Sequence, residues 1–221
     1  EDRDSSRILI DFKVPSENRY ELKEIEVKEI NKNRIEGFCH QLAPRVWSND
    51  AHQDYTIHFV LEFDQPFQKM GSWLNDTIKY GNSFTTDAAA EAGIFLEFDT
   101  RKHPVVQVRS GISYVSITNA GLNLETEISD PFGWSFDAVR NNNIKTWNDL
   151  FGRVVITTDD RIEKVRFYTN FYRAVCSRNI FSDVNGEWIS TDKKTRKLED
   201  PDHVALGCDA FWNTFWNLNQ F

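Results

Sequence analysis

Alternation of apolar and polar residues constrains the first half of this chain more than any other feature. The segment Tyr55–Phe63 carries an apolar or aromatic residue at every odd-numbered position. A period of two places these side chains on one face of a β-strand. Ile25–Ile30 and Arg34–Phe38 repeat the pattern on either side of an Asn-Lys-Asn turn at 31–33, which predicts a β-hairpin.

Further strands are predicted from short apolar runs separated by Gly, Asn, Asp and Pro. They cover Arg7–Phe12, Ala92–Phe98, Pro104–Arg109 and Ser113–Ile117. Strands at this spacing favour an antiparallel β-sandwich. We assign residues 1–125 to this domain and expect it to be incomplete at its start.

Helical patterns follow the strands. Asp130-Pro131 predicts an N-cap followed by proline at the first helical position, and Gly152 predicts the end of that helix. Arg153–Thr157 reads as an isolated strand. Residues 126–158 are therefore expected to form a linker of one helix and one strand.

A wide apolar surface marks the second predicted helix, which begins after Asp159-Asp160 and runs through Phe167–Val175. A helix this apolar is normally buried on more than one side. A third helix is predicted from Asp209 onward. We assign 159–221 to the opening helices of a helical domain. The helices that should pack against them are expected in polypeptide outside this sequence. The sequence is therefore expected to be a fragment. An alternative is a proteolytic piece that folds only beside its missing half.

Charge and cysteine usage exclude several classes of function. The formal net charge is −8, whereas nucleic-acid binding needs a concentrated basic face. The three cysteines have neither CxxC spacing nor an even count, which disfavours a zinc site or a disulfide framework. No apolar run approaches the ~20 residues of a membrane span. We expect no nucleic-acid partner and no membrane span.

The last sixty residues concentrate aromatic and polar groups of the kind that bind sugars. Carboxylates and amides make paired hydrogen bonds to hydroxyls, and aromatic rings stack on the apolar face of a pyranose. The candidates are Asp183, Asn185, Asp209, Trp212 and Asn213. Asp209 and Asn213 are four residues apart and share a helix face.

Structural roles explain the same residues. Asp209 is also a suitable N-cap, and Asn213 a helix-surface amide. Asp183 and Glu187 resemble the carboxylate pair of a glycosidase. However, Asp-Val-Asn-Gly-Glu at 183–187 is also a favourable turn sequence, and local chemistry favours the turn.

Four motifs together resemble glycoside hydrolase family 92, the calcium-dependent exo-α-mannosidases. They are Val108–Ala120, Phe167–Ala174, Asn179–Gly186 and Ala210–Thr214. The resemblance extends over nearly the whole chain. It implies a β-sandwich of the supersandwich type, followed by a linker helix and the first helices of an (α/α)6 barrel.

The resemblance also implies an inverting mechanism in which an acid protonates the glycosidic oxygen and a base activates water, while calcium helps to distort the mannose. The acid, the base and the calcium ligands of the family lie beyond Phe221. We therefore name no catalytic residue and no metal ligand in this chain, and we expect it to be inactive alone.

One sugar-binding residue can be transferred from the family. Its Ser-x-Trp-Asp-Thr motif falls on Ala210–Thr214, so the aspartate that binds sugar in the −1 subsite aligns with Asn213. An amide keeps an acceptor, loses the charge and adds a donor. This departure puts the usual mannose preference in doubt, and Asp209 is a candidate to compensate.

The complete protein is expected to act on mannose-containing oligosaccharides or N-glycans, with α-1,2 specificity and calcium as cofactor. A secreted or periplasmic location is expected, with any signal peptide outside this sequence. The alternative is a non-catalytic carbohydrate-binding β-sandwich with a helical appendage.

Overall fold

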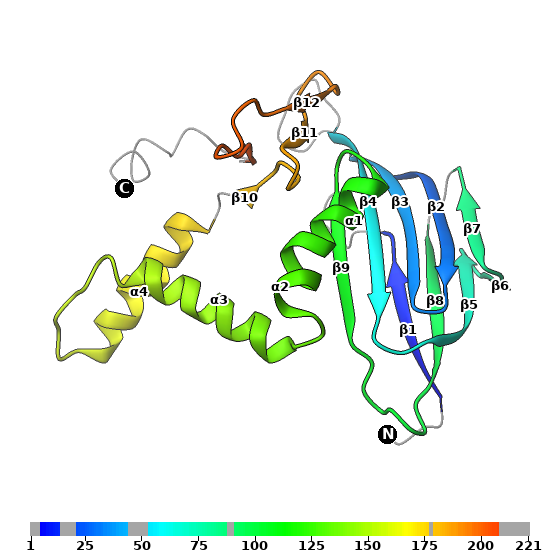
Figure 1. The fold of residues 1–221 in the computed structure, drawn as a ribbon, viewed down its shortest axis with the longest axis horizontal. Helices are drawn as coiled ribbons and strands as arrows, with labels where there is room; N and C mark the ends of the chain where they lie inside the picture. Colours follow the sequence, from blue (N-terminus) through cyan, green and yellow to red (C-terminus); the bar gives the residue numbers. More distant parts are fainter. Residues whose placement is uncertain (1–4, 14–20, 44–52, 88–90, 177–178, 208–221) are drawn as a thin grey trace. The chain divides into compact units, whose positions relative to one another are not determined.

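A computed structural model describes residues 5–13, 21–43, 53–87, 91–176 and 179–207. The chain divides into two compact units, Glu1–Trp134 and Ser135–Phe221. Strands make up most of the first unit and helices the start of the second (Figure 1).

The first unit contains two antiparallel sheets. Within the described residues, one sheet has the strand order β1-β8-β5-β6 and the other β7-β2-β3-β4-β9. The first sheet consists of β1 (Ser5–Asp11), β5 (Phe67–Leu74), β6 (Thr77–Tyr80) and β8 (Ala92–Asp99). The second consists of β2 (Glu21–Asn31), β3 (Arg34–Ala43), β4 (Gln53–Phe63), β7 (Ser83–Thr86) and β9 (Val108–Ser113).

The hydrophobic core lies between these two sheets. Phe63 from β4 and Phe98 from β8 have ring centroids 5.4 Å apart, and Phe67 lies 6.1 and 6.3 Å from them. All three side chains are only 1% exposed. Phe59 and Leu61 also belong to this core, so the face predicted for the Tyr55–Phe63 strand is confirmed there. The two sheets therefore form a β-sandwich, as predicted.

A β-bulge in β2 allows apolar residues that are three positions apart to face the same side of the sheet. Leu22, Ile25 and Val27 are all buried, although Leu22 and Ile25 are three positions apart. The register with β3 shifts between Leu22 and Glu24. A bulge adds one unpaired residue to a strand, so both side chains can face the core.

A helical connector, residues 117–132, follows β9. It consists of α1 (Ile117–Leu124), the π-helical turn η1 (Glu125–Ser129) and α2 (Asp130–Phe132). The predicted strand over Ser113–Ile117 is wrong beyond Ser113, because the Ser116 hydroxyl caps a helix by accepting from the Asn119 N–H. Asp130 has helical dihedral angles and lies inside the connector, so the N-cap predicted there is also wrong.

The second unit begins with two helices. These are α3 (Phe136–Phe151) and α4 (Arg161–Val175), followed by the short pairs β10 (Asn179–Ile180) with β13 (Leu206–Gly207) and β11 (Glu187–Ile189) with β12 (Thr195–Lys197). The predicted end at Gly152 is confirmed, but α3 begins after Ser135, whose hydroxyl accepts from the Ala138 N–H. The strand predicted at 153–157 is wrong, because no neighbouring strand among the described residues pairs with it.

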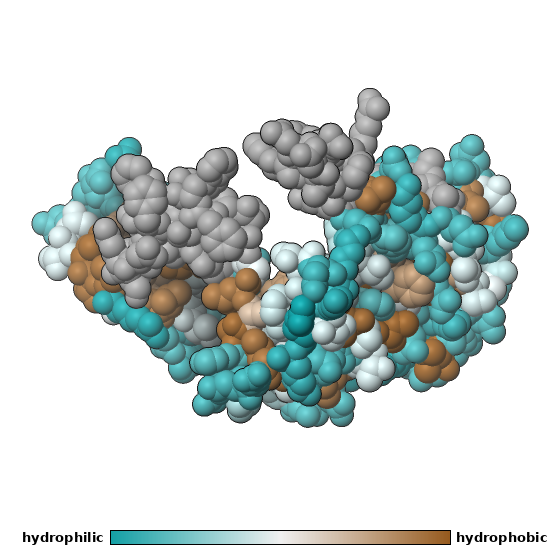
Figure 2. All heavy atoms as spheres, turned by 90° about the horizontal axis from the view of Figure 1, so that it is seen from above, coloured by the Kyte–Doolittle hydropathy of each residue, from teal (hydrophilic) through white to brown (hydrophobic). Residues whose placement is uncertain are grey.

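Apolar residues of α4 are exposed in this structure. Ile162 is 63%, Val165 56% and Tyr172 46% exposed, and no residue of α4 is buried. Hydrophobic surface is visible beside hydrophilic surface over the helices at the left of Figure 2. No helix in the described ranges combines the length and hydrophobicity of a membrane span. The order of a sandwich followed by helices is confirmed, with the helices only partly covered.

The N-cap of α4 should contribute measurably to its stability. Asp160 Oδ1 accepts from the N–H groups of Ile162 (2.7 Å) and Glu163 (3.3 Å). We expect Asp160→Ala to destabilise the helix by about 1 kcal/mol, because two helix-terminal donors lose their partner. Circular dichroism at 222 nm during thermal unfolding measures this loss. Asp159→Ala is the matched control, and an equal effect of both substitutions would contradict the assigned cap.

Candidate functional site

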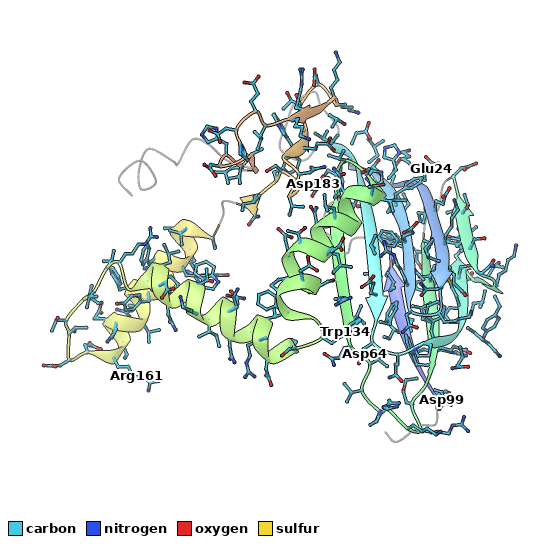
Figure 3. The ribbon with its side chains drawn as sticks, in the orientation of Figure 1. Glu24, Asp64, Asp99, Trp134, Arg161 and Asp183 are labelled. Atoms are coloured by element: carbon cyan, nitrogen blue, oxygen red, sulfur yellow. The ribbon has the colours of Figure 1, made fainter. Side chains whose placement is uncertain are left out.

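Two of the predicted sugar contacts, Asp183 and Asn185, lie in one tight turn (Figure 3 labels Asp183). The Asp183 N–H donates to the Glu187 carbonyl and the Gly186 N–H donates to the Asp183 carbonyl, both at 2.8 Å. Asn185 Oδ1 accepts from the Glu187 N–H at 3.0 Å. Gly186 has a φ of 80°, the left-handed region that favours glycine. The turn that local chemistry favoured is therefore confirmed.

Backbone hydrogen bonds hold this turn on both sides. The Phe181 N–H donates to the Ala205 carbonyl at 2.7 Å, and the Leu198 N–H donates to the Gly186 carbonyl at 2.9 Å. The side chain of Asp183 is buried, with 8% exposed. The turn consequently presents a carboxylate in a largely enclosed position.

A buried indole donor lies next to the turn. Trp188 Nε1 has no hydrogen-bond partner among the residues that the structure describes. An indole N–H is a donor only, and leaving it unpaired in a buried position is unfavourable. Trp188 therefore adds an aromatic ring and a buried, unpaired indole N–H beside the polar groups of this loop.

Asp192 in the β11–β12 hairpin is a structural anion. The Ser190 side chain, the Lys194 backbone N–H and the Arg196 charge hold the pKa of Asp192 below its ordinary value. Arg196 Nη2 lies 2.8 Å from Asp192 Oδ2. A carboxylate stabilised in this way does not serve as a proton donor near neutral pH.

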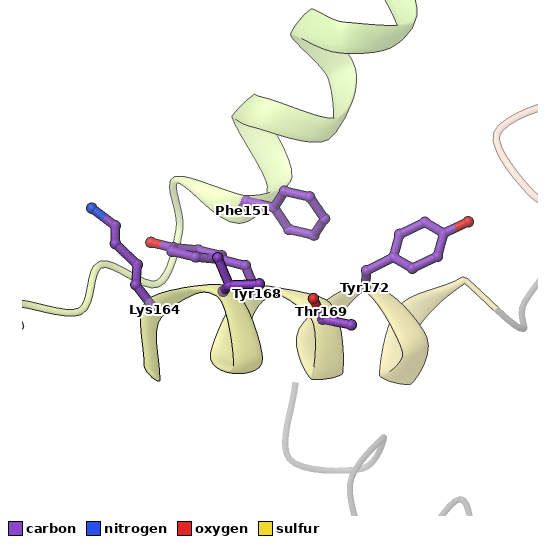
Figure 4. Close-up of a pocket in the computed structure, with 6 residues that line it drawn as sticks. Phe151, Lys164, Tyr168, Thr169 and Tyr172 are labelled. Carbon is purple, nitrogen blue, oxygen red and sulfur yellow. The ribbon is translucent and has the colours of Figure 1, made fainter. Parts of the chain in front are cut away.

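An aromatic groove of about 390 Å³ lies between α3 and α4 (Figure 4). Its lining comprises Phe151, Lys164, Val165, Tyr168, Thr169 and Tyr172. Trp147 and Tyr172 have ring centroids 4.9 Å apart, and the Tyr168 hydroxyl donates to the Val154 carbonyl at 3.1 Å. The aromatic rings of α4, the predicted aromatic helix, thus pack against α3.

Sequence reasoning did not identify Phe151 and Lys164 as part of a groove. The signal was the four-residue spacing of Trp147 with Phe151 and of Tyr168 with Tyr172, which places each pair on one helix face. That two such faces oppose each other is a tertiary property.

The other predicted sugar contacts, Asp209, Trp212 and Asn213, lie outside the described residues. Their role stays a prediction, as does that of Asp183 and Asn185. Among the described ranges, no three His, Cys, Asp or Glu side chains are grouped to hold a metal ion. The described part of the loop carries polar and aromatic side chains on a turn that backbone hydrogen bonds hold in place.

Two family models match the chain one after the other. The model of the glycosyl hydrolase family 92 N-terminal domain matches residues 1–113. The model of the glycosyl hydrolase family 92 catalytic domain matches residues 119–221. No curated protein matches the chain.

Solved structures share this fold. One is a family GH92 inverting mannosidase of Bacteroides thetaiotaomicron, with 19% identity and a TM-score of 0.72, covering 96% of this chain and 26% of that chain. Another is a family GH92 α-mannosidase of the same bacterium, with 21% identity and a TM-score of 0.73, covering 96% and 29%. The latter enzyme was also solved with mannoimidazole, matching with 19% identity and a TM-score of 0.71 over 96% and 28%. The chain thus spans little more than a quarter of these relatives.

Proposed function

Because this chain belongs to glycosyl hydrolase family 92, we propose that it forms part of an exo-acting α-mannosidase. The observation that carries the proposal is the match of both family domains, in order, over nearly the whole chain. The reaction is hydrolysis of terminal mannose from mannose-containing oligosaccharides or N-glycans, with α-1,2 specificity and inversion of the anomeric centre.

The fold neighbours support this substrate class. One is described as an inverting mannosidase, and another binds mannoimidazole. At about a fifth identity they share the fold with this chain, so mannose is transferred to it as a proposal. On this proposal, the sandwich and helices belong to a larger enzyme with an (α/α)6 barrel.

The sugar-binding role is assigned to the C-terminal region. We place Asp183 and Asn185 in a polar wall of the −1 subsite, since both are held in a turn with a buried carboxylate. Trp212 supplies a stacking surface, and Asn213 and Asp209 supply hydrogen-bonding groups.

Calcium does not fit the described residues, which contain no group of three or more candidate side-chain ligands. Calcium is usually held by six to eight oxygen ligands. We assign the cation, with the acid and the base, to polypeptide outside this sequence. We propose no catalytic role for any of the described residues.

The remaining polypeptide is the proposed partner of the exposed helical surface. Ile162 and Val165 are more than half exposed on α4, and burying them would stabilise a completed barrel. A secreted or periplasmic location is proposed, as for an enzyme that degrades external glycans.

Activity assays on two lengths of the protein test the function. We expect no hydrolysis of 4-nitrophenyl α-mannoside by the 221 residues, and calcium-dependent hydrolysis by the polypeptide extended through the whole barrel. Proton NMR should detect β-mannose as the first product, because inversion of an α-mannoside gives that anomer.

Chelation with EDTA followed by calcium addition is the control. Turnover by the 221 residues alone would contradict the proposal that the acid, the base and the cation are held by polypeptide outside this sequence. Glycan binding without turnover by the extended protein would instead favour a carbohydrate-binding module.

A further inference from the structure

An Arg-Glu-Arg ladder crosses the five-stranded sheet on the face that carries α1. Arg34, Glu62 and Arg109 are register partners on β3, β4 and β9. Arg34 Nη1 lies 3.0 Å from Glu62 Oε1, while Arg109 Nε and Nη2 lie 2.8 and 2.7 Å from Glu62 Oε2. Glu62 therefore holds both arginines on this face of the sheet.

Arg109 also contacts the end of the helical connector. Its Nη1 donates to the Gly133 carbonyl at 3.3 Å, and its guanidinium lies 4.2 Å from the centroid of the Trp134 ring. A guanidinium over an indole face is a favourable cation–π arrangement. One arginine thus joins β9 to the last two residues of the first unit, and Figure 3 labels Trp134 at this position.

The two ends of the connector are held by different forces. At its start, Ala120 and Leu124 pack against the buried Val60. A cavity of about 610 Å³ runs along the connector, lined by residues from Ile117 to Asp130 on one side and by Arg34, Glu62 and Arg109 of the sheet on the other. Beyond Ile128, which packs against the same cluster, Arg109 joins the end of the connector to β9 through its contacts with Gly133 and Trp134.

The chain changes direction where Arg109 holds it. Gly133 has φ 54° and ψ −123°, a conformation that ends α2 and is accessible chiefly to glycine. Ser135 then caps α3, the first helix of the second unit. Only one residue, Trp134, separates this glycine from that cap.

We propose that Arg109, positioned by Glu62, is the anchor that fixes the point at which the chain leaves the sandwich for the helical unit. Without it the connector keeps its apolar start on the sheet, but Gly133 and Trp134 are released. Arg109 is in this sense a positioning residue for the junction, and the inference does not depend on the activity proposed above.

Hydrogen–deuterium exchange of the 221-residue protein tests the anchor. We expect Arg109→Gln to accelerate exchange of the Gly133 amide, which donates to the Ser129 carbonyl at 2.9 Å, by about tenfold. Core amides of β4 and β8 should exchange as in the unaltered protein. Chymotryptic cleavage after Trp134 should accelerate in parallel.

Two further variants separate anchoring from general stability. Trp134→Leu removes the ring and keeps the carbonyl contact, so a smaller acceleration is expected at Gly133. Arg101→Gln, which removes an exposed arginine next to Asp99, is the control and should leave Gly133 unchanged. Unchanged exchange at Gly133 in Arg109→Gln, or equal acceleration throughout the sandwich core, would overturn the proposal.

Discussion

Replacing Gly111 by valine is expected to destabilise the first unit by about 3 kcal/mol, because α1 can no longer approach β9. A Cβ atom at this position would lie 2.1 Å from the Ala120 carbonyl oxygen and 2.7 Å from Leu124 Cβ. The nearest obstacle is helix backbone, so relief requires α1 to move off the sheet. That movement would also open the contact of Ala120 and Leu124 with Val60.

Urea unfolding, monitored by tryptophan fluorescence and by far-ultraviolet circular dichroism, measures this loss of stability. Gly81→Val is the matched control, because the nearest atom to a Cβ there is the Ser83 carbonyl at 3.6 Å. The control should change the free energy of unfolding by less than about 0.5 kcal/mol. Similar stability of the two variants would show that α1 does not depend on close approach at Gly111.

Removing the ring of Phe63 is expected to cost about 4 kcal/mol of the unfolding free energy of the sandwich. Phe63 is 1% exposed and contacts Phe67 and Phe98, two rings from the opposite sheet. Phe63→Ala therefore leaves a cavity between the sheets and deletes two aromatic contacts. The loss is large because neither sheet can collapse into the space without changing its hydrogen-bonded register.

Differential scanning calorimetry or urea titration of the 221-residue protein measures this effect. Phe136→Ala makes the same substitution at a side chain that is 71% exposed, and it should change stability by less than about 0.5 kcal/mol. If both variants lost equal stability, the assignment of the core between the sheets would be wrong.

The strands that the sequence predicted are those whose apolar residues alternate. β4 and the β2–β3 hairpin follow this rule, and their inward faces are buried as expected. Alternation is a local property, because successive side chains of a strand point to opposite faces whatever lies beyond. β1 and β8 were predicted instead from short apolar runs bounded by turn residues.

The sequence did not predict β5, because its apolar residues do not alternate regularly and their positions depend on the neighbouring strand β8. Its register with β8 shifts between Phe67 and Lys69, which interrupts the alternation. Gly71 stands where a side chain would be expected, and the ring of Phe95 from β8 occupies the space of its missing Cβ. A glycine read alone indicates a break, whereas here it accommodates a ring from the adjacent strand.

α1 was mistaken partly for a strand because Val115 and Ile117 are β-branched and favour extended structure. Ser116 caps the helix, and Ala120 and Leu124 pack on Val60. Tertiary packing overrides propensity in a segment this short. In the loop of the candidate site, by contrast, the sequence Asn185-Gly186 was sufficient to predict the turn.

By itself, the sequence determined the faces of the longer strands, the turn at Asp183–Glu187 and the family motifs, because each depends on residues close together in the chain. Tertiary structure alone decided the bulge in β2, the fit of α1 over Gly111, and the contact of Arg109 with Glu62 and Trp134. The bulge depends on the pairing of β2 with β3, the fit of α1 on its packing over β9, and the Arg109 contacts on the pairing of β4 with β9. Where strands are far apart in the chain, as β4 and β9 are, no turn between them fixes their register, so it follows from the packing of whole sheets.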